Sequence, residues 1–132
     1  GNSDIGGCHC VSEALGGLYD TPHGVANAVM LPYIMEYNCP ADTAKFARVA
    51  AALGERTERM SEREAARAAV ECVRQLNSDL GMPTLRGIGA REEDLDELAQ
   101  RSSVNVSVDS NPRKVGKEDF YAMLGKAMEA RP

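Results

Sequence analysis

The amino-acid sequence predicts one all-α domain, a helical bundle of about five to six helices over residues 1–132. Hydrophobic residues recur at helical spacing in one segment after another. Aromatic residues make up only 5% of the chain and Trp is absent, a composition that favours helices over a β-sandwich. A length of 132 residues suits a single compact domain with a substantial core.

Charge and hydropathy exclude two classes of partner. A formal net charge of -5 provides no basic surface, so we expect no nucleic-acid partner. The longest apolar stretch, Val25 to Met35, is interrupted by Asn27 and Pro32 and is shorter than the roughly 18 residues of a transmembrane helix, so we expect no membrane. There is no signal-peptide pattern, and the four cysteines lack the spacing of a disulfide scaffold. We therefore expect a reduced, cytoplasmic setting.

The first predicted helix spans Ile5 to Tyr19. Val11, Leu15 and Leu18 share one face of it, at the spacing of an amphipathic helix. Gly16-Gly17 weakens the helix and allows a neighbouring element to pack closely against it.

The second predicted helix, His23 to Tyr37, is apolar almost all round, which indicates a buried central helix. Asp20 or Thr21 is expected to cap its N-terminus, with Pro22 near the first helical position. Pro32 is expected to kink it or to loosen one turn.

Two further helices are predicted in the middle of the chain. Asp42 caps the first of them, and Gly54 ends it. Ser61 and Glu64 form a capping box at the start of the second, which stops at Gly81. The apolar stripe of this long helix is Ala65, Ala69, Cys72, Val73, Leu76 and Leu80. Its charged residues are expected on a solvated face: Glu62, Arg63, Arg67, Glu71 and Arg74.

The C-terminal part is predicted to hold two helices, Arg91 to Arg101 and Glu118 to Glu129. Between them, valines alternate with polar residues from Val104 to Val108, which is strand periodicity. Because the sequence offers no partner strand, we interpret Ser102 to Arg113 as an extended loop.

Both histidines of the chain lie between Gly6 and Asn38. His9 and Glu13 are four residues apart, so they share one face of a helix, and His23 lies in the opening turn of the next helix. Two imidazoles and a carboxylate at such a joint could hold a divalent metal ion. The residue chemistry alone leaves open a stand-alone metal hydrolase and a catalytically inert helical oligomerisation module.

The wording of this stretch is more specific. HCVSEALGGLYDTPHGVANAVMLPYIMEYN resembles the signature of the iron-containing (group III) alcohol dehydrogenases, with nearly every motif position present. The similarity continues through Gly81 to Thr84, the Glu-Glu-Asp-Leu start at Glu92, and Asn111-Pro112-Arg113. It covers essentially the whole chain, but only about the last third of a full-length member. The fold it implies is the C-terminal helical domain of a dehydroquinate synthase-like protein.

The resemblance implies a metal- and NAD(P)-dependent oxidoreduction of a small alcohol or aldehyde in the intact protein. His9 and His23 correspond to two of the four metal ligands, so half of the set for Fe²⁺ or Zn²⁺ is expected here. NAD(P) would bind only through a missing N-terminal nucleotide-binding domain, and the chain alone is expected to be inactive. Glu13 stands where the family usually has a histidine near the nicotinamide and substrate, which makes it the catalytic candidate. Asp20 is a weaker pocket candidate.

Self-association is also expected. The resemblance implies that the first helices pack against upstream elements, so their removal would expose Val25 to Met35. Exposure of that stretch would cost several kcal/mol at about 25 cal/mol per Å². We therefore expect a homo-oligomer, a symmetric dimer that buries residues near Ile5 to Leu18.

Overall fold

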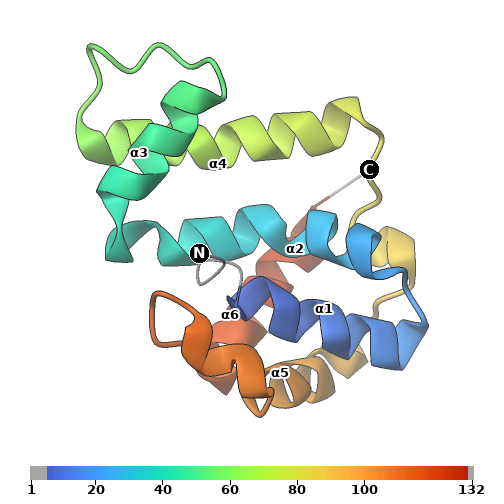
Figure 1. Cartoon of the computed structure of the whole chain (residues 1–132). Coiled ribbons are helices and arrows are strands. Elements are labelled where there is room, and N and C mark those ends of the chain that lie inside the picture. The colour runs from blue at the N-terminus through green and yellow to red at the C-terminus, as the bar shows by residue number, and fades with distance from the viewer. Residues whose placement is uncertain (1–5, 131–132) are drawn as a thin grey trace.

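The computed structural model describes residues 6–130, which form six α-helices joined by turns and short 3-10 helices (Figure 1). The bounds of the helices are α1 Gly6–Tyr19, α2 His23–Asn38, α3 Thr43–Ala52, α4 Glu62–Asp79, α5 Leu95–Ser103 and α6 Lys117–Glu129. No strand occurs among the described residues, which confirms the predicted all-α class. No helix within residues 6–130 is both long enough and apolar enough to cross a membrane.

Helix α2 is the central element of the fold. In Figure 1 the α3–α4 hairpin lies on one side of α2, and α1, α5 and α6 lie on the other. Met30 and Ile34 are fully buried in α2, and Pro32 lies inside the helix, which continues for 16 residues. The prediction that this apolar helix is buried at the centre of the fold is therefore confirmed, because several neighbouring helices pack against it.

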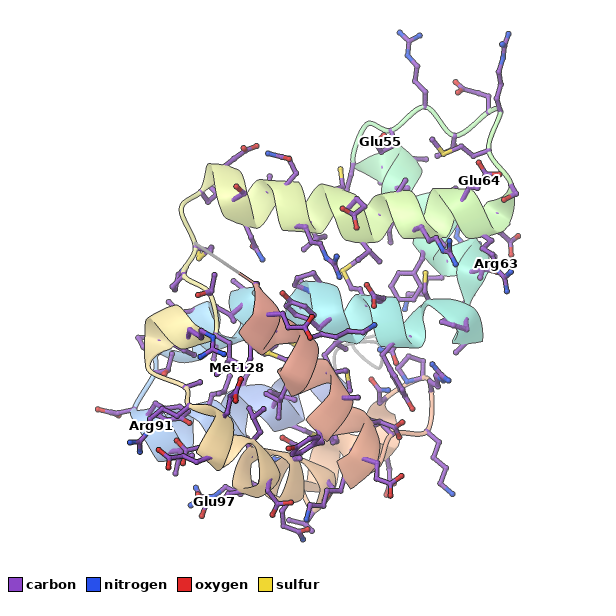
Figure 2. All side chains as sticks on the ribbon, turned by 180° about the vertical axis from the view of Figure 1, so that it is seen from behind. Glu55, Arg63, Glu64, Arg91, Glu97 and Met128 are labelled. Carbon is purple, nitrogen blue, oxygen red and sulfur yellow. The ribbon has the colours of Figure 1, made fainter. Side chains whose placement is uncertain are left out.

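Apolar residues form two clusters on the two sides of α2. The larger cluster joins α1, α2, α5 and α6. It includes Leu15, Leu98 and Phe120, whose side chains are fully buried. The smaller one joins the end of α2 to α3 and α4 around Phe46 and Val70. Charged side chains lie on the outside, as Figure 2 shows for Arg91 and Glu97 near α5.

Asp42 and Ser61 are confirmed as the N-caps of α3 and α4. The carboxylate of Asp42 accepts a hydrogen bond from the backbone N–H of Lys45 at 3.1 Å, and Ser61 Oγ accepts one from the backbone N–H of Glu64 at 3.1 Å. Both helices end at a glycine with positive φ, 97° at Gly54 and 70° at Gly81. At each glycine, paired backbone hydrogen bonds to the last turn close the helix in a Schellman motif.

The predicted start of α2 at His23 is confirmed, but its predicted cap is wrong. Asp20 and Thr21 do not cap this helix, which begins at His23 after Pro22, with no capping bond from a side chain. Asp20 instead ends α1, because it adopts φ 55° and its N–H donates to the carbonyl of Gly16 at 3.0 Å. Aspartate tolerates the left-handed region better than most residues, so it can take the place of a terminal glycine.

Two predictions for the C-terminal part are also corrected. Ser102 to Arg113 is not an extended loop, since α5 runs to Ser103 and residues Val106–Ser110 form a 3-10 helix. Local bonds such as that from the Val108 N–H to the Asn105 carbonyl, 3.1 Å, satisfy the backbone without a partner strand. Helix α5 starts at Leu95 rather than Arg91, because residues Glu92–Asp94 form a separate 3-10 turn.

The predicted apolar stripe of α4 holds only in its first half. Ala65 and Ala69 are buried, but Leu76 and Leu80 are 53% and 65% exposed. The reason is length, because α4 has 18 residues whereas α3, which covers it, has 10. The exposure predicted for Val25 to Met35 is not observed either, since the exposed large hydrophobic residues in the described part of the chain lie outside α1 and α2.

Candidate functional site

Helices α1 and α2 carry the three residues predicted for the site. His9 lies in α1, His23 is the first residue of α2, and the two helices pack side by side (Figure 1). The side chains of His9 and His23 lie outside the described part of the structure. Their assignment as metal ligands therefore stays a prediction.

Polar groups link α1 to α2 within an otherwise apolar interface. Ser12 Oγ donates to the side-chain carbonyl oxygen of Asn27. The thiol of Cys8 donates to the backbone carbonyl of Asn27 at 3.5 Å and to Asn27 Oδ1 at 3.7 Å. Ser12 and Cys8 are 1% and 2% exposed, so both need partners within the protein, and Asn27 accepts a hydrogen bond from each.

The two cysteines beside His9, Cys8 and Cys10, are small buried residues. Burial raises the pKa of the Cys8 thiol to about 11 and that of the Cys10 thiol to about 11. Both thiols therefore remain protonated at neutral pH in the metal-free chain.

Glu13 is an exposed residue of α1. Its carboxylate accepts a hydrogen bond from Asn105 Nδ2, at the turn between α5 and the 3-10 helix Val106–Ser110. The carboxylate is thus accessible to small molecules, and it is held toward the segment that precedes α6. Its predicted catalytic role stays a prediction.

The residues that could complete a metal site do not gather in the described part. Among the described side chains, no group of three or more His, Cys, Asp and Glu could hold a metal ion. Asp20 is exposed, and its observed contribution is to end α1. Two imidazoles on two adjacent, polar-linked helices fit half of a four-ligand site for Fe²⁺ or Zn²⁺, and the remaining donors would have to come from elsewhere.

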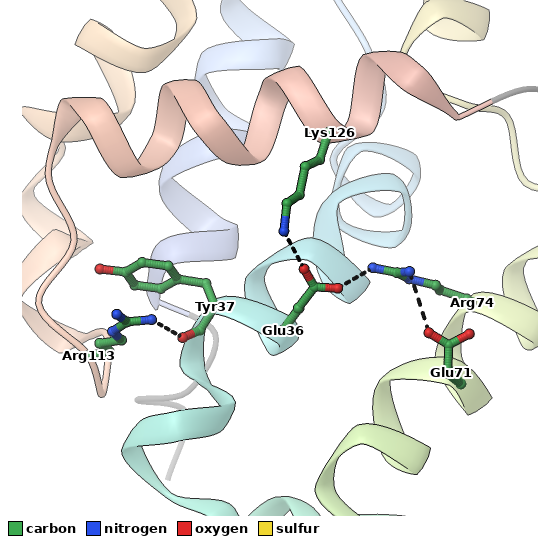
Figure 3. Close-up of polar contacts among 6 residues, drawn as sticks. All are labelled: Glu36, Tyr37, Glu71, Arg74, Arg113 and Lys126. Carbon is green, nitrogen blue, oxygen red and sulfur yellow. Dashed lines mark hydrogen bonds and ion pairs between the residues drawn. The ribbon is translucent and has the colours of Figure 1, made fainter. Parts of the chain in front are cut away.

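A second polar centre, which sequence reasoning missed, surrounds Glu36. Its carboxylate accepts from Lys126 Nζ of α6 at 2.7 Å and from Arg74 Nη2 of α4 at 2.6 Å (Figure 3). Arg74 also lies over the ring of Tyr33, 5.4 Å from its centroid. The bond from Lys126 is the main cause that holds the pKa of Glu36 below its usual value. The prediction that Arg74 lies on a solvated face is therefore wrong. Arg74 instead joins α4 to α2.

One sequence signal could have identified this centre. Glu36 is the only Asp, Glu, Lys or Arg in the apolar second helix, His23–Asn38. A single carboxylate in such a helix requires a cationic partner. The sequence does not reveal which cations approach it, because Arg74 and Lys126 are 38 and 90 residues away.

The Asn-Pro-Arg segment has a structural role at the same end of α2. Asn111 and Asn38 are buried and exchange two side-chain hydrogen bonds, 3.0 and 2.8 Å long. Arg113 donates to the carbonyl of Tyr37 at 2.8 Å and lies 4.2 Å from the centroid of the Tyr37 ring (Figure 3). These contacts fix the connection before α6 to the end of α2.

The fold matches the helical part of known alcohol dehydrogenases. The chain superposes with a TM-score of 0.89 on 1,3-propanediol oxidoreductase, at 38% sequence identity, over 92% of this chain and 32% of that protein. An alcohol dehydrogenase from Oenococcus oeni matches with a TM-score of 0.87 at 41% identity, over 91% of this chain and 32% of the other. The structure thus belongs to the class of helical domains found in these oxidoreductases.

Sequence comparison gives the family. Residues 1–128 match the family model described as "Fe-containing alcohol dehydrogenase family, C-terminal", and the chain belongs to this family. Lactaldehyde reductase of Escherichia coli (strain K12) is 44% identical over 127 residues, and 1,3-propanediol dehydrogenase of Citrobacter freundii is 39% identical over 127 residues. Each alignment covers 96% of this chain but 33% of the relative, so the chain spans about a third of their length.

Proposed function

We propose that this chain is the helical, metal-binding domain of a metal- and NAD(P)-dependent dehydrogenase that interconverts small alcohols and aldehydes. The observation that carries the proposal is the family match over residues 1–128, together with the His9 and His23 motif on adjacent helices. The relatives named lactaldehyde reductase and 1,3-propanediol dehydrogenase support the class of substrate.

In this proposal His9 and His23 hold the metal as neutral imidazoles. A divalent iron or zinc ion bound there would act as a Lewis acid toward the oxygen of the alcohol or aldehyde. Glu13 supplies an accessible carboxylate on the face of α1 that it shares with His9, where it can accept or return the proton of the alcohol. Nicotinamide binding belongs to a nucleotide-binding domain, the partner that the activity requires, and the remaining metal ligands belong to an upstream helix.

Two finer proposals concern setting and assembly. We place the protein in the cytoplasm, because its cysteines are free and its relatives are dehydrogenases. Homo-oligomer formation also remains a proposal, although the inward face of α1 is packed in the core and is not available for contact. Sedimentation velocity at micromolar concentration is expected to show a dimer, and a stable monomer would rule this out.

A hybrid enzyme tests the proposed activity. This chain would replace the matching C-terminal third of E. coli lactaldehyde reductase, with the unmodified reductase purified alongside as the reference. We expect the hybrid to bind one metal ion and to reduce lactaldehyde with a nicotinamide cofactor, and the chain alone to be inactive. His9→Ala and His23→Ala should each abolish the activity of the hybrid.

A folded hybrid that holds metal and cofactor but is inactive would overturn the proposal. So would activity that survives both histidine substitutions. Hydrolytic activity of the chain alone, lost in Glu13→Gln, would favour a stand-alone metal hydrolase. A folded chain with no metal dependence of any kind would favour an inert helical module.

A further inference from the structure

Asn27 lies close in sequence to one predicted ligand, His23, and contacts residues on both sides of the other, His9. It lies four residues, about one turn, after His23 on α2. Its partners on α1 flank the other histidine, since Cys8 directly precedes His9 and Ser12 follows it by three residues. One residue of α2 therefore contacts α1 on both sides of His9.

The surroundings of these contacts are apolar. Val11 and Leu15 of α1 and Ala26 and Met30 of α2 are each 0% exposed. Dispersion and hydrophobic contacts are not directional, so they specify the offset between two packed helices less sharply than a hydrogen bond does. A hydrogen bond is directional, and a buried hydroxyl or thiol that loses its acceptor is destabilised.

The observed offset of α1 against α2 satisfies Ser12, Cys8 and Asn27 together. Polar groups in apolar helix interfaces are known to set register in this way. A metal site needs such a device, because ligand positions must match the preferred distances within about 0.2 Å. Groups that orient ligands typically change metal affinity by about 10–100-fold when they are removed.

We propose that Asn27 is a positioning residue: it fixes the offset of α1 against α2 and so holds His9 and His23 at the separation that one metal ion requires. This inference rests on the proposed function, in which the two histidines bind the same ion. It assigns Asn27 a role through the helices that carry the ligands, not through contact with the ion.

The structure offers a matched control. Asn77 of α4 donates through Nδ2 to the backbone carbonyl of Ala28 at 2.7 Å, so it also anchors a helix to α2, one residue beyond Asn27. It links α2 to α4 rather than to α1. Asn77→Ala removes the same side chain and a hydrogen bond to α2, here one that the amide donates, without touching the α1–α2 interface.

Zinc titration of the full chain by calorimetry, paired with urea unfolding, is the main test. We expect Asn27→Ala to weaken zinc binding about tenfold or more. Asn77→Ala should lower stability but leave zinc affinity at the wild-type value. Ser12→Ala, a milder change, should weaken zinc binding in the same direction by less, and the double variant Ser12→Ala/Asn27→Ala should bind no more weakly than Asn27→Ala.

Imidazole NMR spectra of the metal-free chain provide a second readout. The chain has 2 histidines, so the spectrum contains two Cε1–H signals, one from each ring. Both should shift in Asn27→Ala and stay in place in Asn77→Ala. Wild-type zinc affinity in a folded Asn27→Ala, or an equal loss in Asn77→Ala, would overturn the inference.

The two proposals fail separately. If the wild-type chain binds no zinc, or if binding survives His9→Ala and His23→Ala, the proposed metal site is wrong. The imidazole signals then decide whether Asn27 sets the two histidines at all: unchanged signals in Asn27→Ala would overturn the positioning role. If zinc binding depends on both histidines, the affinities of Asn27→Ala and Asn77→Ala decide it.

Discussion

Glu36→Gln removes one charge from the junction of three helices while it preserves the size of the side chain. Glu36 of α2 binds Arg74 of α4 at 2.6 Å and Lys126 of α6 at 2.7 Å (Figure 3). The substitution is expected to lower the free energy of unfolding at pH 7 by about 1–2 kcal/mol, because a neutral amide cannot replace two charge-assisted bonds.

The magnitude follows from burial. Hydrogen bonds to charged groups contribute roughly 1.5–3 kcal/mol when they are shielded from water, whereas exposed ion pairs contribute about 0–1 kcal/mol. The side chains of Glu36, Arg74 and Lys126 are 39%, 36% and 63% exposed, so solvent screens both pairs and each falls near the lower range. Tyr33 and Glu71 also contact the guanidinium of Arg74 and help to hold it in place.

The pH dependence of this contribution has a definite sign. The folded state lowers the pKa of Glu36, chiefly through the bond from Lys126, below its ordinary value of 4.5. The ionised form is therefore stabilised by folding, and its contribution is complete well above pH 4.5. It declines as the pH falls through 4.5 toward the lowered pKa, and it is lost below that value.

Urea unfolding followed by far-UV circular dichroism measures both effects. The free energies of unfolding of wild type and Glu36→Gln should differ at pH 7 and become equal as the pH falls well below 4.5. Added salt should reduce the difference at pH 7. The control is Glu97→Gln, which removes an exposed pair to Arg101 at 3.5 Å and should change stability by less than about 0.5 kcal/mol. Equal stability of Glu36→Gln and wild type at pH 7, or a difference unchanged at low pH, would refute this reasoning.

Three other substitutions have definite expected outcomes. Glu13→Gln should leave zinc affinity unchanged in a calorimetric titration, because the exposed carboxylate is bound to Asn105; a loss of sub-micromolar affinity would instead make Glu13 a ligand. Phe120→Ala, at a fully buried site, should lower the free energy of unfolding by about 3–5 kcal/mol in urea denaturation, and a loss below about 1 kcal/mol would mean that the core repacks. Asp20→Gly should raise stability by about 0.5 kcal/mol, because glycine adopts the positive φ without strain; thermal unfolding at a lower temperature than wild type would contradict this.

Much of the fold could be predicted because its determinants are local. The caps at Asp42 and Ser61 and the terminal glycines Gly54 and Gly81 act within a few residues, and each is observed as predicted. The apolar character of α2 likewise required no knowledge of its neighbours. A helix that is hydrophobic all round must be covered on all sides.

The corrected features depend on information that is not local. Asp20 has two local options, an N-cap and a left-handed helix end, and only the packing of α1 against α2 selects the second. Leu76 and Leu80 fit an apolar stripe, but their exposure depends on where α3 stops. The Glu36 centre unites three distant segments, and the resemblance that predicted His9 and His23 contains no comparable signal for it.

The central claim is that His9 and His23 together form half of a metal site. Zinc titration of the chain by calorimetry, with His9→Ala and His23→Ala as variants, tests it most directly. We predict one ion per chain bound more weakly than about 1 µM, because two imidazoles leave a four-ligand site half empty, with binding lost in each variant. Binding that survives both substitutions, or no binding by the folded wild-type chain, would contradict the claim.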